Sequence, residues 1–73
     1  MKKTFMLEDL ECAHCAAKME EAIRRLEGVT AANINFFAQK LTLEADDAAF
    51  DAVVKQAAAA IRKVEPDCTL VIK

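Results

Sequence analysis

The sequence predicts a small α+β domain with the element order strand, helix, strand, strand, helix, strand. Three observations support this order: two stretches carry apolar residues at helical spacing, four short stretches favour strands, and the only glycine and the only proline lie at expected breaks. With 73 residues, the chain is long enough for one domain, which we expect to span residues 1–73.

The first predicted elements are a strand and a helix. Residues 3–9 favour a strand in which Phe5 and Leu7 share one face. Residues 12–27 predict a helix after the first turn, because apolar side chains recur there at helical spacing. These side chains are Ala16, Met19, Ile23 and Leu26. Gly28 follows as the expected left-handed C-terminal cap of this helix.

A β-hairpin is expected in the middle of the chain. Residues 29–36 alternate apolar and polar side chains, and the apolar ones are Ala32, Ile34 and Phe36. Residues 41–44 alternate in the same way after a short polar break at residues 38–40. Two strands that lie this close in the sequence are typical of a hairpin.

The last predicted elements are a second helix and a short strand. Either Asp46 or Asp47 is expected to cap the helix, which runs to about Lys63 with one apolar face. That face consists of Phe50, Val53, Val54, Ala57, Ile61 and Val64. Pro66 prevents the helix from continuing because proline lacks the backbone N–H, and residues 68–72 form the last strand. This order predicts the ferredoxin-like sandwich, in which one antiparallel sheet carries both helices on a single face.

Charge and composition argue against several classes of function. Ten lysines and arginines against twelve aspartates and glutamates leave a net charge of −2, whereas a nucleic-acid-binding domain usually carries a basic surface. No apolar run approaches the roughly 20 residues that span a bilayer. No apolar stretch follows the basic pair near the start, as a signal peptide requires. We therefore expect a soluble cytoplasmic domain with no nucleic-acid partner and no membrane insertion of this segment.

The three cysteines indicate the chemistry. An odd number without an export signal does not favour a disulfide scaffold, and a close pair in a reducing cytosol is typical of metal binding or redox catalysis. Cys12 and Cys15 lie where the first strand passes into the first helix, whose N-terminal N–H groups and macrodipole stabilise thiolates. Soft thiolates favour Cu(I), Zn(II) and their heavier relatives. The alternative to metal binding or redox catalysis is that Cys12 and Cys15 are two buried structural cysteines.

Three further side chains are candidate metal ligands. Glu11 is either a third ligand or a solvated carboxylate that only adds negative potential. Cys68 is either a third thiolate, which would suit Cd(II) or Pb(II), or a small buried residue, and the second interpretation is favoured because free cysteine is among the most buried residue types. His14 is expected to point outward into solvent. The charge of Lys18 offsets a negative metal–dithiolate site or is simply solvated.

These motifs resemble the heavy-metal-associated domain, a family of metallochaperones and N-terminal modules of metal-exporting P-type ATPases. In place of the family's Met-x-Cys-x-x-Cys the chain has LECAHC at residues 10–15. Three further stretches fit the family: AAK at 16–18, LEGV at 26–29 and NINF at 33–36. The resemblance covers nearly the whole chain and is strongest to domains of zinc-, cadmium- and lead-exporting ATPases. It implies that Cys12 and Cys15 are the metal ligands.

Two departures from the family pattern bear on the choice of metal. Copper-specific members usually have Thr before the first cysteine, where this chain has Glu11. Copper members also tend to place Lys, Phe or Tyr after a glycine in the loop before the last strand, where this chain has EPDC at residues 65–68. The resemblance therefore favours Zn(II), Cd(II) or Pb(II) over Cu(I).

The sequence leaves competing functions open. The favoured one is a non-catalytic domain that binds a soft metal ion and passes it to the core of a metal-transporting ATPase or to another metal-binding domain, as a monomer or a weak metal-bridged dimer. A Cu(I) chaperone-type domain is one alternative. A thiol–disulfide oxidoreductase with a CxxC motif is another. The element order counts against the oxidoreductase, and the only proline, Pro66, would have to serve as its cis-proline.

Overall fold

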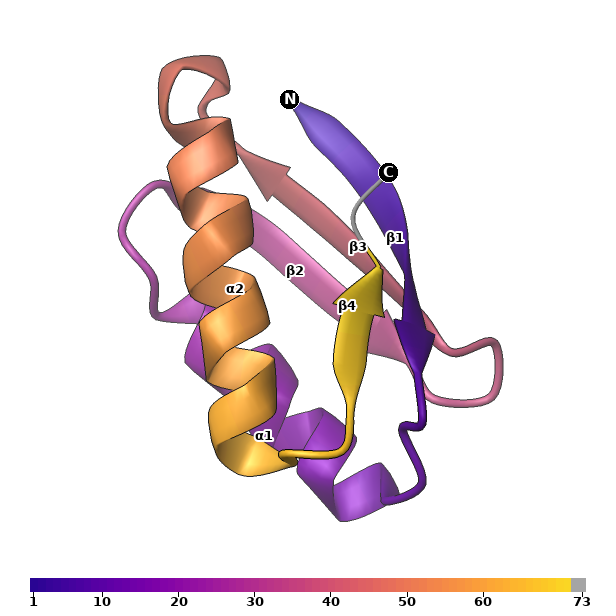
Figure 1. Ribbon diagram of the computed structural model, residues 1–73. Helices are drawn as coiled ribbons and strands as arrows, with labels where there is room; N and C mark the ends of the chain where they lie inside the picture. Colours follow the sequence, from indigo (N-terminus) through magenta and orange to yellow (C-terminus); the bar gives the residue numbers. More distant parts are fainter. Residues whose placement is uncertain (72–73) are drawn as a thin grey trace.

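The computed structural model describes residues 1–71 and confirms the predicted order of elements (Figure 1). The elements are β1 (Lys2–Glu8), α1 (Ala13–Arg24), β2 (Val29–Asn35), β3 (Lys40–Ala45), the 3-10 turn η1 (Asp47–Ala49), α2 (Phe50–Val64) and β4 (Thr69–Val71). Residue 72 of the expected last strand lies outside the described residues. Within the described part of the chain, neither helix has the length and apolar character needed to cross a bilayer.

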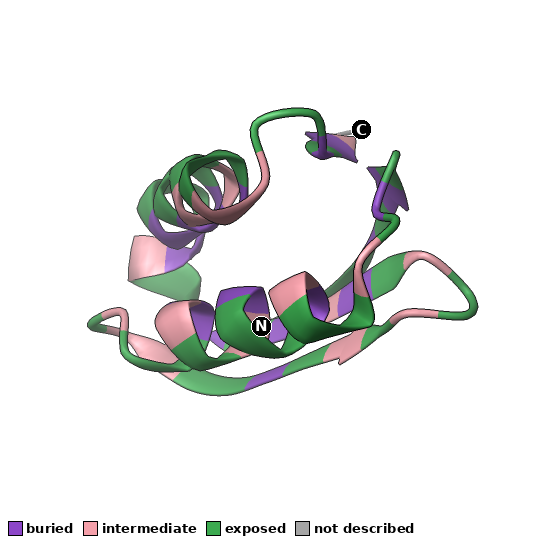
Figure 2. Ribbon diagram, turned by 90° about the horizontal axis from the view of Figure 1, so that it is seen from below, coloured by how far each residue is buried: buried purple, intermediate pink, exposed green. Residues whose placement is uncertain are grey.

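The four strands form one antiparallel sheet in the order β2-β3-β1-β4. The chain's first and last strands are neighbours in this sheet, and Leu7 pairs with Leu70. Both helices cover the same face, as the ferredoxin-like prediction requires (Figures 1 and 2). As a consequence, the loop that leaves β1 and the loop that enters β4 meet at one end of the molecule.

The core lies between the helices and the covered face of the sheet, and Figure 2 shows buried segments on the helices and on the strands that they cover. Phe5 and Leu7 are buried on β1, as the alternation predicted. The apolar face of α2 is buried from Phe50 to Ile61, and Val64 at its end is only half-buried. Burial of apolar area is the main favourable contribution to folding in a domain this small.

The first helix ends earlier than the sequence predicted. α1 stops at Arg24 rather than at Glu27, and the Leu26 N–H donates to the carbonyl of Ile23 at 3.1 Å in the turn that follows. Gly28 has the expected positive φ of 92°, but it belongs to the turn before β2 and is not the residue that follows the helix cap. The apolar spacing continues through Leu26 because this side chain still packs against the core after the helix has ended.

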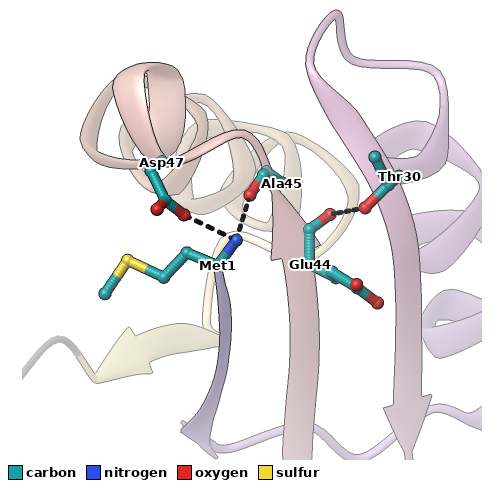
Figure 3. A network of polar contacts seen from close by, with 5 residues as sticks. All are labelled: Met1, Thr30, Glu44, Ala45 and Asp47. Atoms are coloured by element: carbon teal, nitrogen blue, oxygen red, sulfur yellow. Dashed lines mark hydrogen bonds and ion pairs between the residues drawn. The ribbon is translucent and has the colours of Figure 1, made fainter.

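The expected aspartate cap of the second helix is not formed. The N-cap residue of α2 is Ala49, and η1 separates the helix from Asp46, which makes no side-chain cap hydrogen bond. Asp47 instead pairs with the Met1 ammonium group at 2.8 Å, and that group also donates to the Ala45 carbonyl at 2.7 Å (Figure 3). The prediction failed because η1 puts Ala49, which has no side-chain acceptor, at the N-cap position of α2.

Side chains of α1 cover the outer edge of β2. The Glu20 carboxylate accepts from the Ile34 N–H at 2.7 Å, and the Arg24 Nε donates to the Ala32 carbonyl at 2.8 Å. Glu20 and Arg24 also form an ion pair at 3.1 Å. The two bonds to the strand tie α1 to the edge of the sheet.

Candidate metal site

The cysteine pair sits at the start of α1, where Cys12 is the N-cap residue. Its backbone is extended, with φ −122° and ψ 113°, and its sulfur accepts from the Cys15 N–H at 3.2 Å. The Cys12 carbonyl accepts the first helical hydrogen bond, from the Ala16 N–H at 3.0 Å. The sulfur thus replaces the oxygen that a serine or aspartate cap usually supplies. CxxC spacing therefore places one thiol at the cap and the other in the first turn.

The two thiols are half-buried, and each shifts the pKa of the other. A hydrogen bond from the Cys15 thiol, helped by the Cys15 backbone N–H, lowers the pKa of Cys12 below its ordinary value of 9.0. The same thiol–thiol hydrogen bond, together with burial, raises the pKa of Cys15. Cys12 is therefore the first of the pair to become a thiolate.

A carboxylate approaches the pair from the opposite end of the chain. Glu65 is the C-cap residue of α2, and its carboxylate lies 3.9 Å from the Cys15 sulfur. Sequence reasoning did not select Glu65 as a site residue. A signal was available: Pro66 fixes where the second helix stops, and the ferredoxin-like strand order puts the following loop beside the loop after β1.

Further carboxylates surround this end of the molecule. A depression of about 340 Å³ is lined by Asp9, Glu11, Glu65 and Asp67. Glu11, a predicted candidate ligand, is exposed and lines this depression. Across residues 1–71, no three histidine, cysteine, aspartate or glutamate side chains are already grouped so that they could hold a metal ion. The thiolate pair with one nearby carboxylate is the arrangement that the structure brings together.

Cys68 is fully buried, with 0% of its surface exposed, and belongs to the hydrophobic core. Burial raises the pKa of its thiol, and the negative charges of Glu65 and Asp9 raise that pKa further. Its backbone N–H donates to the Glu65 carbonyl at 3.0 Å in the turn before β4. Cys68 thus lies close to the site in space, while its thiol is packed as an apolar residue would be.

The remaining sequence candidates lie at the margins of the site. His14 is exposed near the start of α1, as expected. Lys18 is exposed one turn further along, and its positive charge acts to lower the pKa of Cys15, against the other effects that raise it. The effect of Lys18 is the smallest of those acting on the pKa of Cys15, and the hydrogen bond with Cys12 and burial outweigh it.

The fold and the thiolate pair together define a small domain of the metal-binding class. A comparison with family models then finds that the heavy-metal-associated domain matches residues 4–67, and the chain belongs to this family. Domains of this family bind heavy metals without being catalytic, in chaperones and at the N-termini of ATPases. Membership confirms the resemblance that the sequence motifs indicated.

Three relatives show the range of proteins to which the chain is similar. The cadmium, zinc and cobalt-transporting ATPase of Bacillus subtilis is 27% identical over 96% of this chain, which spans 10% of the ATPase's length. The copper chaperone CopZ of Enterococcus hirae is 33% identical over 66% of this chain and 70% of its own. The solved N-terminal domain of ZntA in its Zn(II) form is 28% identical, with a TM-score of 0.73 over 96% of this chain and 88% of its own.

Proposed function

We propose that this chain binds a soft divalent metal ion, Zn(II), Cd(II) or Pb(II), through the thiolates of Cys12 and Cys15, and delivers it to a metal-transporting ATPase or to another metal-binding domain. One observation carries the proposal: two half-buried sulfurs lie at the start of the first helix, one at its cap and one in its first turn, and the Glu65 carboxylate lies 3.9 Å from the second. Similarity to the Bacillus cadmium, zinc and cobalt transporter supports the divalent preference.

The charges around the pair support a divalent ion over a monovalent one. A divalent ion on two thiolates is neutral, whereas Cu(I) on two thiolates keeps one negative charge. The carboxylates of Glu11 and Glu65 would repel that negative charge, and this repulsion is stronger near a protein surface than in bulk water. Zn(II) also takes four ligands and accepts carboxylate oxygen, so Glu65 supplies the oxygen that such an ion needs.

The exposure of the pair supports transfer by ligand exchange. Cys12 and Cys15 are both partly accessible, so an incoming thiolate of a partner can join the metal before a resident thiolate leaves. The metal is then never released to water. Because thiolates bind the metal and thiols do not, loading releases the protons that the two thiols carry in the metal-free protein.

Cu(I) binding is the alternative that one observation favours. Two thiolates suffice for the near-linear geometry of Cu(I), and the chain is also similar to the copper chaperone CopZ. Such a site would need neither Glu65 nor Glu11. The two functions therefore differ in whether the carboxylates contribute to affinity.

A competition titration of the fully reduced protein tests the proposal. Zn(II), Cd(II) and Cu(I) are titrated against a chelator while the thiolate-to-metal absorbance is followed. Cys12→Ser is expected to abolish tight binding, and Glu65→Gln to weaken Cd(II) and Zn(II) but not Cu(I). Glu44→Gln, on an exposed carboxylate of β3, is the matched control and should change neither. Tight Cu(I) binding with weak Cd(II) binding in the wild type would replace the proposal by its alternative.

A further inference from the structure

One side-chain amide joins the β2–β3 turn to the loop that carries the cysteines. The Gln39 side chain accepts from the Leu10 N–H at 3.1 Å and donates to the Leu10 carbonyl at 2.8 Å. The same amide nitrogen donates to the Phe36 carbonyl at 2.8 Å within its own turn. The Gln39 backbone carbonyl accepts from the Leu7 N–H at 2.8 Å. Gln39 is therefore bonded both to its own β2–β3 turn and to the loop between β1 and α1.

The backbone of Leu10 needs these bonds. β1 ends at Glu8 and α1 begins at Ala13, so Leu10 belongs to neither element. Its side chain is nevertheless buried, with 3% of the residue exposed, which carries the backbone away from water. A buried N–H or carbonyl without a partner is unfavourable, and the Gln39 amide satisfies both groups as a neighbouring peptide would.

The backbone at the two ends of this contact is strained. Among residues 1–71, Asp9 and Gln39 are the non-glycine residues with positive φ, at 61° and 55°. Such conformations persist where surrounding contacts hold them, and they cluster at functional sites. Glycine would adopt the turn conformation of residue 39 more readily. A glutamine at this position therefore brings a side chain that the turn itself does not require.

We propose that Gln39 is a positioning residue for the metal-binding loop. By holding both backbone groups of Leu10, its amide fixes the segment that enters Cys12, so that the Cys12 sulfur stays at the cap of α1 before any metal arrives. A site that is ordered in advance binds more tightly, because less freedom is lost on binding. This inference rests on the proposed function, since the loop it orders is the proposed metal site.

Two variants separate the amide from the turn. Gln39→Leu keeps the bulk of the side chain and removes its hydrogen bonds. Gln39→Gly removes the amide, including its bond to the Phe36 carbonyl, but relieves the positive φ, so the turn loses one hydrogen bond and gains a residue that adopts its conformation readily. Gln56→Leu, on an exposed glutamine of α2, is the matched control. Circular dichroism with urea titration establishes that each variant is folded under the conditions used.

The first measurement is amide hydrogen exchange of the metal-free protein by NMR. Exchange at Leu10 and Cys15 is expected to speed up about tenfold in both Gln39 variants relative to the core amide of Leu43, since the amide that bonds to both backbone groups of Leu10 is gone. The Gln56 variant should match the wild type. If Leu10, Cys15 and Leu43 change by the same factor, Gln39 only supports global stability and the inference is wrong.

The second measurement is Cd(II) affinity of the same proteins. Both Gln39 variants are expected to bind Cd(II) about tenfold more weakly, with the same thiolate-to-metal absorbance as the wild type, because the ligands are unchanged. Unchanged affinity in the Gln39 variants would overturn the positioning role while leaving the proposed function intact. A wild type that binds neither Cd(II) nor Zn(II) would instead overturn the proposed function. The exchange experiment uses the metal-free protein, so it would still show whether Gln39 orders the loop.

Discussion

The Glu65 carboxylate lies 3.9 Å from the Cys15 sulfur, although 50 positions separate the two residues in the chain. The contact exists because β4 pairs with β1, which places the end of α2 beside the start of α1. The negative charge of Glu65 acts on the site in two opposite ways. It raises the pKa of both Cys12 and Cys15, which disfavours thiolates, and it offers an oxygen ligand to a bound cation.

Glu65→Gln separates these two effects. Without the negative charge, the pKa of each paired thiol falls, so alkylation of the metal-free protein below pH 9 becomes faster. More acidic thiols alone would strengthen metal binding. We nevertheless expect Cd(II) affinity to fall by at least about tenfold, because a ligand is lost. Iodoacetamide kinetics and a Cd(II) competition titration on the same sample measure the two effects.

Asp67→Asn is the matched control for this experiment. Asp67 lines the same acidic depression but is not the carboxylate in contact with the Cys15 sulfur. Its replacement removes one charge from the surroundings and should change Cd(II) affinity much less than Glu65→Gln does. Equal losses in the two variants would mean that the carboxylates act only through their summed potential and that Glu65 is not a ligand.

The opposite pKa shifts of Cys12 and Cys15 predict an order of thiol reactivity. The pKa of Cys12 lies below 9.0 and that of Cys15 above it, so in the metal-free protein Cys12 holds the larger thiolate fraction at neutral pH. Brief alkylation at pH 7, followed by mass spectrometry, should modify Cys12 first and the buried Cys68 last. Alkylation of Cys12 speeds up with pH until its lowered pKa is passed and then levels off.

Cys15→Ala tests the cause of that order. The substitution removes the thiol that donates to the Cys12 sulfur and keeps the backbone N–H that bonds to it at 3.2 Å. The pKa of Cys12 should therefore rise toward its ordinary value, and its alkylation at pH 7 should slow. If the rate in this variant equals that of the wild type, the helix N-terminus alone activates Cys12.

The sequence predicted the fold from periodicity and the placement of both cysteines at the start of the first helix from spacing, because both are local properties of the chain. It did not predict Glu65 as a site residue, since that role depends on which loops meet across the sheet. It placed an aspartate cap on the second helix, but η1 puts Ala49 at the N-cap position. The role of Glu65 was missed because a distant part of the chain supplies a polar partner, whereas the cap was missed because of a local 3-10 turn.

Cys68 predicts an alkaline loss of stability. Burial raises the pKa of its thiol, so the folded protein holds this proton more tightly than the unfolded chain does. The contribution to stability is complete below the ordinary pKa of 9.0 and is lost as the pH rises through the higher folded value. Urea titrations of the wild type between about pH 7 and 11, on either side of that pKa, should show this decline.

Cys68→Ala isolates the thiol and tests its role as a ligand. Removal of a buried sulfur is expected to lower the free energy of unfolding at pH 7 by about 1 kcal/mol, and the alkaline decline should become shallower. Cd(II) affinity should stay unchanged if Cys68 is only a core residue. A clear loss of Cd(II) affinity would identify a third thiolate ligand, which the buried position does not favour.

The edge of β2 is protected by a side chain, and its removal should promote self-association. The Glu20 carboxylate accepts from the Ile34 N–H at 2.7 Å, in the place that a further strand would occupy. Glu20→Ala frees this N–H and breaks the ion pair with Arg24. We expect the free energy of unfolding to fall by about 1 kcal/mol and a concentration-dependent dimer to appear in sedimentation velocity.

Glu20→Gln distinguishes edge protection from the ion pair. The amide oxygen of glutamine can still accept from the Ile34 N–H, while the charge that pairs with Arg24 is gone. A partly exposed ion pair contributes little to stability, so this variant should stay monomeric and nearly as stable as the wild type. Dimerisation of Glu20→Gln to the same extent as Glu20→Ala would show that the ion pair, acting through Arg24 and the Ala32 carbonyl, is what keeps the edge closed.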